Sequence, residues 1–128
     1  MEAVMSAKPC NILCIEDEDE IRTTIAEVLE DEGYAVSTAA NGRDGLALAI
    51  EQRPDLIICD IFMPHLDGFA VCREFHAANA GNEHVPFIFL SALPQDDAML
   101  KRQRVVFDAY LTKPVDFDDL LAKIAVLT

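Results

Sequence analysis

Short apolar runs and amphipathic stretches alternate along this chain, which predicts alternating strands and helices. The apolar runs predict five strands, at 12–15, 34–38, 56–60, 85–90 and 109–112. Apolar residues with helical spacing follow each run and predict five helices, of which the fourth covers 96–106. Gly33 is expected to end the first helix, while Asp67-Gly68 and Asp116 are expected to begin the third and fifth.

The expected strands are apolar throughout rather than alternating, so both faces of their sheet should be covered by helices. Because crossovers between parallel strands are right-handed, the pattern favours an α/β fold with a doubly wound, five-stranded parallel sheet. We expect a single domain over residues 10–128, preceded by a loose lead-in at 1–9.

Composition narrows the class of protein. The net charge of −13 over 128 residues argues against direct contact with nucleic acid. No apolar run approaches the roughly 18 residues of a membrane span, and Glu2 stands where a secretion signal would be basic. The four cysteines (10, 14, 59 and 72) lack metal-binding spacing. A reduced, cytoplasmic protein without a membrane partner is the simplest interpretation.

Acidic residues follow two of the expected strands. Glu16 and Asp17 come directly after the first strand, and Asp60 ends the third. In a parallel sheet the carboxyl ends of the strands lie at the same edge, and ligands bind at that edge. Each pair of like charges at ~4 Å would cost on the order of 4 kcal/mol, so a cation is expected, and Mg²⁺ suits a few carboxylates best. Alternatively, the acidic run 16–20 serves the start of a helix, as we expect for its last three residues.

A hydroxyl and an ammonium group reach the same expected edge. Ser91 follows the fourth strand and Lys113 the fifth. Each residue alone is weak evidence for a functional site, because a Ser after a strand often caps a helix and a Lys before Pro is often solvated. Together with the carboxylates they indicate a site for a phosphoryl group on Asp60. Asp60 would be the nucleophile, Lys113 and the metal would neutralise charge, and the Ser91 hydroxyl would hydrogen-bond a phosphoryl oxygen.

Four motifs in order, ILCIED, LIICDIFMPHLDG, FLSA and AYLTKP, span most of the chain. This series resembles the receiver domain of bacterial two-component response regulators, as in chemotaxis receivers. The resemblance implies a flavodoxin-like strand order, 2-1-3-4-5, with five helices. It implies a phosphorylation-controlled switch rather than an enzyme.

The resemblance also implies roles for residues. Asp60 would accept a phosphoryl group from a sensor histidine kinase or a phosphotransfer protein. Mg²⁺ would be held by Glu16, Asp17, Asp60 and the backbone carbonyl of Phe62. Glu16 replaces the Asp that is commoner in the family, which changes reach but not charge.

By the same resemblance, Ser91 and Tyr110 form the switch that reshapes the face made by the fourth helix, fifth strand and fifth helix. That face would bind a downstream protein target or support a phosphorylation-dependent homodimer. Tyr110 could also be an edge-strand aromatic with its hydroxyl in water, which is compatible with the switch role. The basic cluster expected on this face, either for docking or simply as a solvated helix surface, comprises Lys101, Arg102 and Arg104.

The chain departs from the family at two places. Val106-Phe107-Asp108 stands where the family usually has Gly-Ala-Asp, which removes an easy helix stop. We therefore expect a shifted end to the fourth helix, with Phe107 either in the core or exposed to a partner. Phe62 and Leu93 border the expected route of an attacking water, and neither can orient one, which predicts slow self-dephosphorylation. The three histidines (65, 76 and 84) share no spacing, and none is expected to act chemically.

Three functions stay open. The chain could be an interaction module without an output domain, or a receiver from a longer transcription regulator or hybrid kinase. A third interpretation is a metal-dependent phosphatase with an Asp nucleophile. Such enzymes carry a second Asp two residues after the nucleophile, where this chain has Phe62, so this interpretation is disfavoured.

Overall fold

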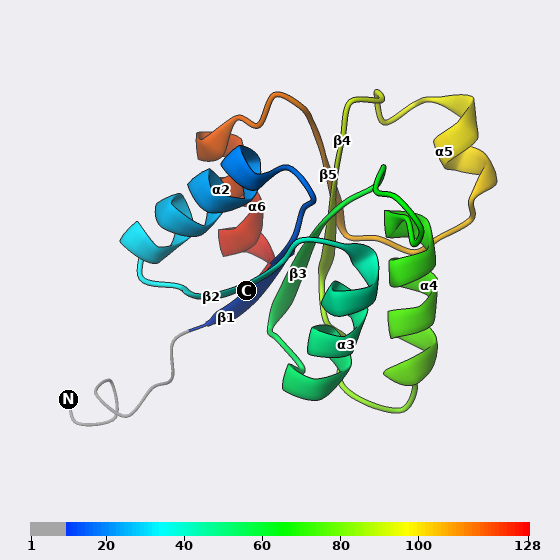
Figure 1. Cartoon of the computed structure of the whole chain (residues 1–128), viewed down its shortest axis with the longest axis horizontal. Coiled ribbons are helices and arrows are strands. Elements are labelled where there is room, and N and C mark those ends of the chain that lie inside the picture. Colours follow the sequence, from blue (N-terminus) through cyan, green and yellow to red (C-terminus); the bar gives the residue numbers. More distant parts are fainter. Residues whose placement is uncertain (1–9) are drawn as a thin grey trace.

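Five parallel strands form the centre of the computed structural model, which describes residues 10–128 (Figure 1). The strands are β1 (Asn11–Ile15), β2 (Ala35–Ala39), β3 (Leu56–Asp60), β4 (Phe87–Ser91) and β5 (Ala109–Thr112). Their order in the sheet is β2-β1-β3-β4-β5. The expected doubly wound fold and strand order are thereby confirmed. The lead-in expected at 1–9 lies outside the described residues.

Helices cover both faces of the sheet. They are α2 (Asp19–Asp31), α3 (Gly42–Gln52), α4 (Gly68–Ala78), α5 (Ala98–Arg102) and α6 (Phe117–Leu127). Apolar residues of α2 and α6 pack on one face, and those of α3, α4 and α5 pack on the other (Figure 1). Within residues 10–128, no helix combines the length and apolar character needed to cross a membrane.

Local signals explain where the helices begin and end. The expected caps are confirmed, since the side chains of Asp67 and Asp116 accept hydrogen bonds from backbone amides of α4 and α6. Asn41 and Asp97 do the same for α3 and α5. Gly33 follows α2 with φ of +94°, a conformation that favours glycine, and thus ends that helix as expected.

The cysteines lie among the packed apolar residues. Cys14, Cys59 and Cys72 are fully buried, whereas Cys10, just before β1, is partly exposed. Burial raises the pKa of the Cys14 thiol to about 12 and also raises that of Cys59. All four are free thiols, and the buried ones behave as small apolar residues.

The predicted fourth helix, 96–106, is wrong in length, because α5 ends at Arg102. Arg104 adopts a left-handed conformation with φ of 51°, so the chain leaves the helix early. Phe107 then packs on the core, with ring centroids 5.3 Å from Phe89 and 6.1 Å from Tyr110. Of the two expectations for Phe107, core packing is the one observed. Arg104 therefore does not share a helix face with Lys101.

Candidate functional site

The carboxyl ends of four strands carry the candidate site. Glu16 and Asp17 follow β1, Asp60 is the last residue of β3, Ser91 is the last residue of β4, and Lys113 follows β5. Because the strands are parallel and β1, β3, β4 and β5 are successive neighbours, these residues meet at one edge of the sheet.

The backbone around Asp60 is firmly held. The Ile61 amide donates to the Leu90 carbonyl at 3.0 Å, and the Gly68 amide donates to the Ile61 carbonyl at 2.8 Å. A Cβ atom on residue 68 would lie 2.4 Å from the Asp60 carbonyl oxygen. Only glycine lets the start of α4 approach so closely, and this contact limits how far Asp60 can move.

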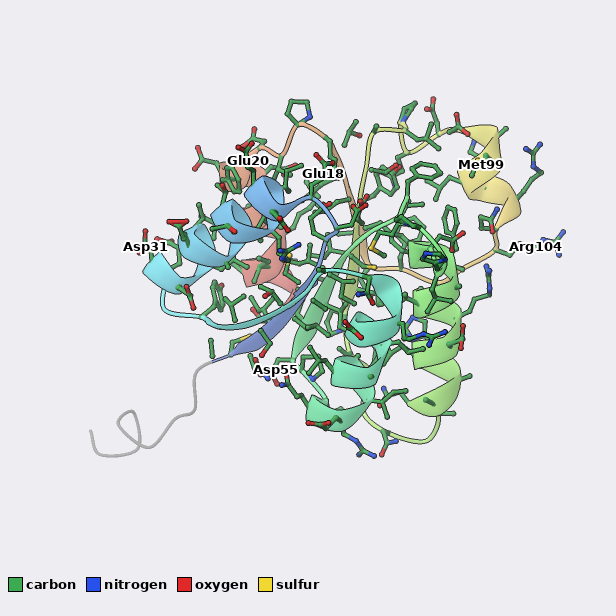
Figure 2. All side chains as sticks on the ribbon, in the orientation of Figure 1. Glu18, Glu20, Asp31, Asp55, Met99 and Arg104 are labelled. Carbon is green, nitrogen blue, oxygen red and sulfur yellow. The ribbon has the colours of Figure 1, made fainter. Side chains whose placement is uncertain are left out.

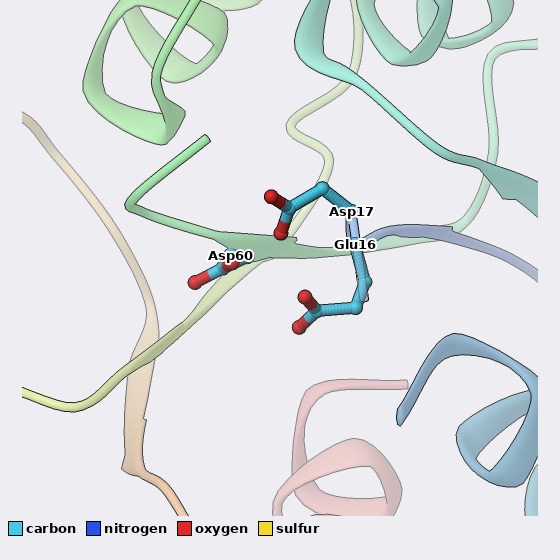
Figure 3. A group of neighbouring side chains, drawn as sticks. All are labelled: Glu16, Asp17 and Asp60. Atoms are coloured by element: carbon cyan, nitrogen blue, oxygen red, sulfur yellow. The ribbon is translucent and has the colours of Figure 1, made fainter. Parts of the chain in front are cut away.

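Three carboxylates converge at this edge. One oxygen each from Glu16, Asp17 and Asp60 lies within 4.8 Å of the others. Figure 3 shows the three side chains reaching from the ends of β1 and β3 toward a common space. Glu16 is fully buried and Asp60 is 3% exposed. Such proximity of buried like charges requires a compensating cation.

Lys113 supplies part of this compensation. Its Nζ lies 3.0 Å from Glu16 Oε1 and 3.3 Å from Asp60 Oδ2. Burial alone would lower the pKa of the Lys113 ammonium, but its contacts with Glu16 and Asp60 outweigh burial and raise it. Lys113 is therefore held in its charged form between two buried acids.

The electrostatics of Asp60 reflect this crowding. Burial raises the pKa of the Asp60 carboxyl from its ordinary 3.8 to about 7, and the charge of Glu16 adds to the rise. Lys113 opposes the shift without cancelling it. The single ammonium therefore leaves the ionised carboxylates undercompensated, and a further cation would stabilise them.

The donor set fits a hard divalent metal. Glu16 Oε1 is buried and accepts no well-aligned hydrogen bond from residues 10–128, although Lys113 Nζ lies near it as an ion-pair partner. The three converging carboxylates supply the oxygen ligands that Mg²⁺ prefers, with room left for water. The residues present thus suit the magnesium ion that the sequence predicts.

Glu18 has a contact that the sequence interpretation missed. It occupies the N-cap position of α2, but its side chain makes no capping hydrogen bond. Instead its Oε1 lies 3.3 Å from Lys113 Nζ. Glu18 thus stands at the helix start as expected, but its side chain pairs with Lys113 rather than capping a backbone amide. The signal available in the sequence was its place two residues after Glu16, on the same turn out of the strand.

Ser91 and Tyr110 are linked through Leu93. The fully buried Ser91 accepts a hydrogen bond at Oγ from the Leu93 amide, at 3.0 Å. The Tyr110 hydroxyl donates to the Leu93 carbonyl at 2.7 Å, and the residue is 6% exposed. The expectation that the Tyr110 hydroxyl lies in water is therefore wrong. Burial raises the pKa of its phenol.

The remaining sequence-predicted residues lie around this centre. Phe62 is 46% exposed and Leu93 is half-buried. Lys101, Arg102 and Arg104 are exposed, away from the carboxylates. His65 is exposed, while His76 and His84 contact the Val106 carbonyl and Asp108 respectively. The metal-compatible carboxylate group among the described residues includes no histidine.

Comparison with known proteins establishes the class. The model of the response regulator receiver domain matches residues 12–125. This chain therefore belongs to the response-regulator receiver family, a family of switch domains rather than of turnover catalysts. Members bind Mg²⁺ at a buried acidic cluster of the kind that Glu16, Asp17 and Asp60 form.

Individual relatives are regulatory proteins that match most of this chain. The transcriptional regulatory protein AfsQ1 of Streptomyces coelicolor is 41% identical over 114 residues, which cover 89% of this chain and 49% of that protein. The DNA-binding dual master transcriptional regulator RpaA of Synechocystis is 36% identical over 116 residues, covering 91% and 48%. The chain thus spans about half the length of these relatives.

Solved structures show the same fold. The chemotaxis protein CheY4 of Vibrio cholerae superimposes with a TM-score of 0.85 at 28% identity, covering 94% of this chain and 100% of that one. A receiver domain protein from Clostridium thermocellum gives a TM-score of 0.80 at 33% identity, covering 92% and 93%.

Proposed function

We propose that Asp60 is the phosphoacceptor of a two-component or phosphorelay system. Its phosphoryl group would come from a sensor histidine kinase or a phosphotransfer protein, in the cytoplasm. The observation that carries this proposal is the setting of Asp60, which lies at a strand end, 3% exposed, beside a second buried acid and within 3.3 Å of Lys113. A buried, ionised carboxylate in such a place lowers the stability of the fold unless it pairs with a charged ligand.

In the transfer step, an oxygen of the Asp60 carboxylate attacks phosphorus as the bond to the donor histidine nitrogen breaks. The electron pair of that bond stays on the imidazole, and a mixed anhydride forms on Asp60. The ammonium of Lys113 would move its contact from the carboxylate to a phosphoryl oxygen. Mg²⁺, when bound, supplies charge neutralisation and would be held by Glu16, Asp17, Asp60 and the Phe62 carbonyl.

The output would run through Ser91 and Tyr110. The Ser91 Oγ accepts from the Leu93 amide, which leaves its hydroxyl proton for a phosphoryl oxygen. Tyr110 holds the same Leu93 through its carbonyl. A displacement of Ser91 would therefore move Leu93 and change the position of Tyr110. The shape of the surface formed by α5, β5 and α6 would then change, which would alter binding of a downstream target or of a second copy of the chain.

Two apolar side chains support slow loss of the phosphoryl group. Phe62 and Leu93 lie two residues beyond Asp60 and Ser91 respectively, and neither can hydrogen-bond an attacking water. We propose a phosphorylated form that lasts well beyond seconds. Following the phosphorylated mass after removal of the donor measures this lifetime, and decay within seconds would contradict it.

A second candidate is the same switch within a longer regulator. The relatives of about twice this length, among them a regulator named as DNA-binding, favour it. In that case the receiver itself would still make no direct contact with nucleic acid, because its charge of −13 repels phosphates. A phosphatase is the weakest candidate, since Phe62 occupies the position of the acid that such an enzyme needs.

The decisive experiment is intact mass spectrometry after incubation with Mg²⁺ and a small acyl phosphate. We expect the wild-type chain to gain one phosphoryl group and Asp60→Asn to gain none. Asp31→Asn, at the exposed end of α2, is the matched control and should gain one group. An equal gain in Asp60→Asn, or none in the wild type at saturating donor, would overturn the proposal.

A further inference from the structure

A basic groove lies between α4 and the segment that follows α5. It encloses about 410 Å³ and is lined by Arg73, His76, His84, Arg104, Val105 and Val106. It is separate from the carboxylate edge, because none of its lining residues belongs to the site described above. Figure 2 shows Arg104 projecting outward at the corner where the chain leaves α5.

The groove exists because α5 ends early. Side chains of α4 hold the departing segment against that helix: His76 Nε2 lies 3.0 Å from the Val106 carbonyl oxygen, and the Cys72 thiol donates to the same oxygen at 3.3 Å. Arg73 reaches Gln103 at 3.5 Å. With the left-handed turn at Arg104, these contacts leave a channel with basic rims.

The charges of the rim are unmatched. Within residues 10–128, neither Arg73 nor Arg104 forms an ion pair, and the same holds for the adjacent Lys101 and Arg102. These are four of the ten Lys and Arg residues in a chain with 23 acids. Asp108 is already engaged, by His84 at 3.0 Å and by the Phe87 amide at 2.7 Å.

The groove also offers apolar surface. Val106 is 70% exposed, and Val105 contacts the core beneath. An inorganic anion would use the arginines but would gain nothing from Val106. An occupant that combines negative charge with an aliphatic side chain would use both.

We propose that this groove docks an acidic segment of a partner protein, in which carboxylates flank an aliphatic side chain. The carboxylates would pair with Arg73 and Arg104, and the aliphatic group would cover Val106. This docking goes beyond the phosphoryl switch, since no groove residue touches Asp60. A nucleic acid is a poorer occupant, because its phosphate backbone carries no aliphatic side chain to cover Val106.

Fluorescence anisotropy with the unphosphorylated full chain tests the proposal. The probe is a labelled 12-residue peptide of repeated Glu-Glu-Leu, compared with its Gln-Gln-Leu counterpart. We expect the Glu peptide to bind at least about tenfold more tightly than the Gln peptide, and about tenfold more weakly to an Arg73→Gln/Arg104→Asn double variant. Asn is chosen at 104 because it tolerates the left-handed conformation.

A matched control removes two other arginines that lack ion pairs in the described part of the chain. Arg43→Gln/Arg53→Asn changes the net charge equally, and Arg53 is also left-handed, with φ of 48°. This variant should bind the Glu peptide as the wild type does. Val106→Ser should weaken binding about threefold through lost apolar contact.

Three outcomes would overturn the proposal. Equal loss in both double variants would mean general charge attraction. Equal affinity of Val106→Ser and wild type, with displacement of the peptide by millimolar inorganic phosphate, would mean a small-anion site. No binding of the Glu peptide would remove the groove as a docking site. Because the phosphoryl transfer is measured by mass without any peptide, failure of one proposal leaves the other standing.

Discussion

The edge of the sheet at Asp60 and the segment from residue 92 to 108 are held by different means. At Asp60, ladder hydrogen bonds and the close approach of Gly68 fix the backbone. From 92 to 108 local backbone hydrogen bonds are supplemented by side chains that tie the segment to its neighbours, such as the Tyr110 hydroxyl on Leu93 and the His76 ring on Val106. Only five residues of this segment are helical.

This difference suits a switch. Acceptor chemistry requires a nucleophile and its neighbours to be positioned before the donor arrives, which a sheet edge provides. A reporting segment must have a second arrangement at small cost, and contacts made by single side chains of about 1 kcal/mol each can be exchanged. The contrast leads to three further tests.

The largest effect on stability is expected from Lys113→Met, which removes the ammonium group that offsets the buried carboxylates at the Asp60 edge of the sheet. It leaves Glu16 and Asp60 buried without their ammonium partner, which should cost roughly 3–5 kcal/mol of unfolding free energy in metal-free buffer. Urea unfolding followed by circular dichroism measures this cost. Lys123→Met, which breaks an exposed pair with Asp119, should cost less than about 1 kcal/mol. Equal costs would contradict the assignment of Lys113 as the central cation.

The next effect is the pH dependence that Asp60 imposes. Its pKa is raised to about 7 in the folded chain, from an ordinary 3.8. The folded chain therefore keeps a proton that the unfolded chain releases, and stability should fall as pH rises from about 4 to about 7. Asp60→Asn should abolish this fall in stability, because Asn does not ionise.

We thus expect metal-free Asp60→Asn to be more stable than wild type by roughly 2–4 kcal/mol at pH 8 and nearly equal at pH 4. Urea unfolding in a chelating buffer across this range measures it. Added Mg²⁺ should narrow the difference at pH 8 by stabilising the wild type alone. A constant difference at every pH would show that the ionised Asp60 carboxylate is not destabilising.

The smallest effect is expected from Tyr110→Phe, which acts on the side-chain-held segment. It removes the hydrogen bond to the Leu93 carbonyl at a cost of about 1 kcal/mol. Hydrogen exchange should speed up at 92–97 and stay unchanged in β1 and β3. Tyr34→Phe, in which the altered hydroxyl lies far from this segment in sequence, is the control. Faster exchange along β3 in Tyr110→Phe would contradict the separation of the two regions.

Much of the fold could be predicted because its strands are apolar runs bounded by turn residues. β3 and β5 have the predicted bounds, Leu56–Asp60 and Ala109–Thr112. β4 starts at Phe87 rather than at residue 85, because Pro86 has no amide to donate to the sheet. β2 is shifted by one residue, to Ala35–Ala39.

The proximity of the site residues could be predicted from strand ends, since parallel strands bring their carboxyl ends together. The end of α5 could not, because it depends on contacts from Cys72 and His76, about thirty residues earlier in the chain. Nor could the pairing of Glu18 with Lys113, which joins residues 95 positions apart. Local sequence patterns give no information about contacts between residues so far apart in the chain.

The unequal burial of the cysteines gives this protein a ready-made attachment point. Only the Cys10 thiol is reachable by a maleimide dye, and it lies just before β1, at the opposite end of the strands from Asp60. A fluorophore could therefore be placed on the natural sequence without mutagenesis, at the end of the sheet opposite the acceptor edge.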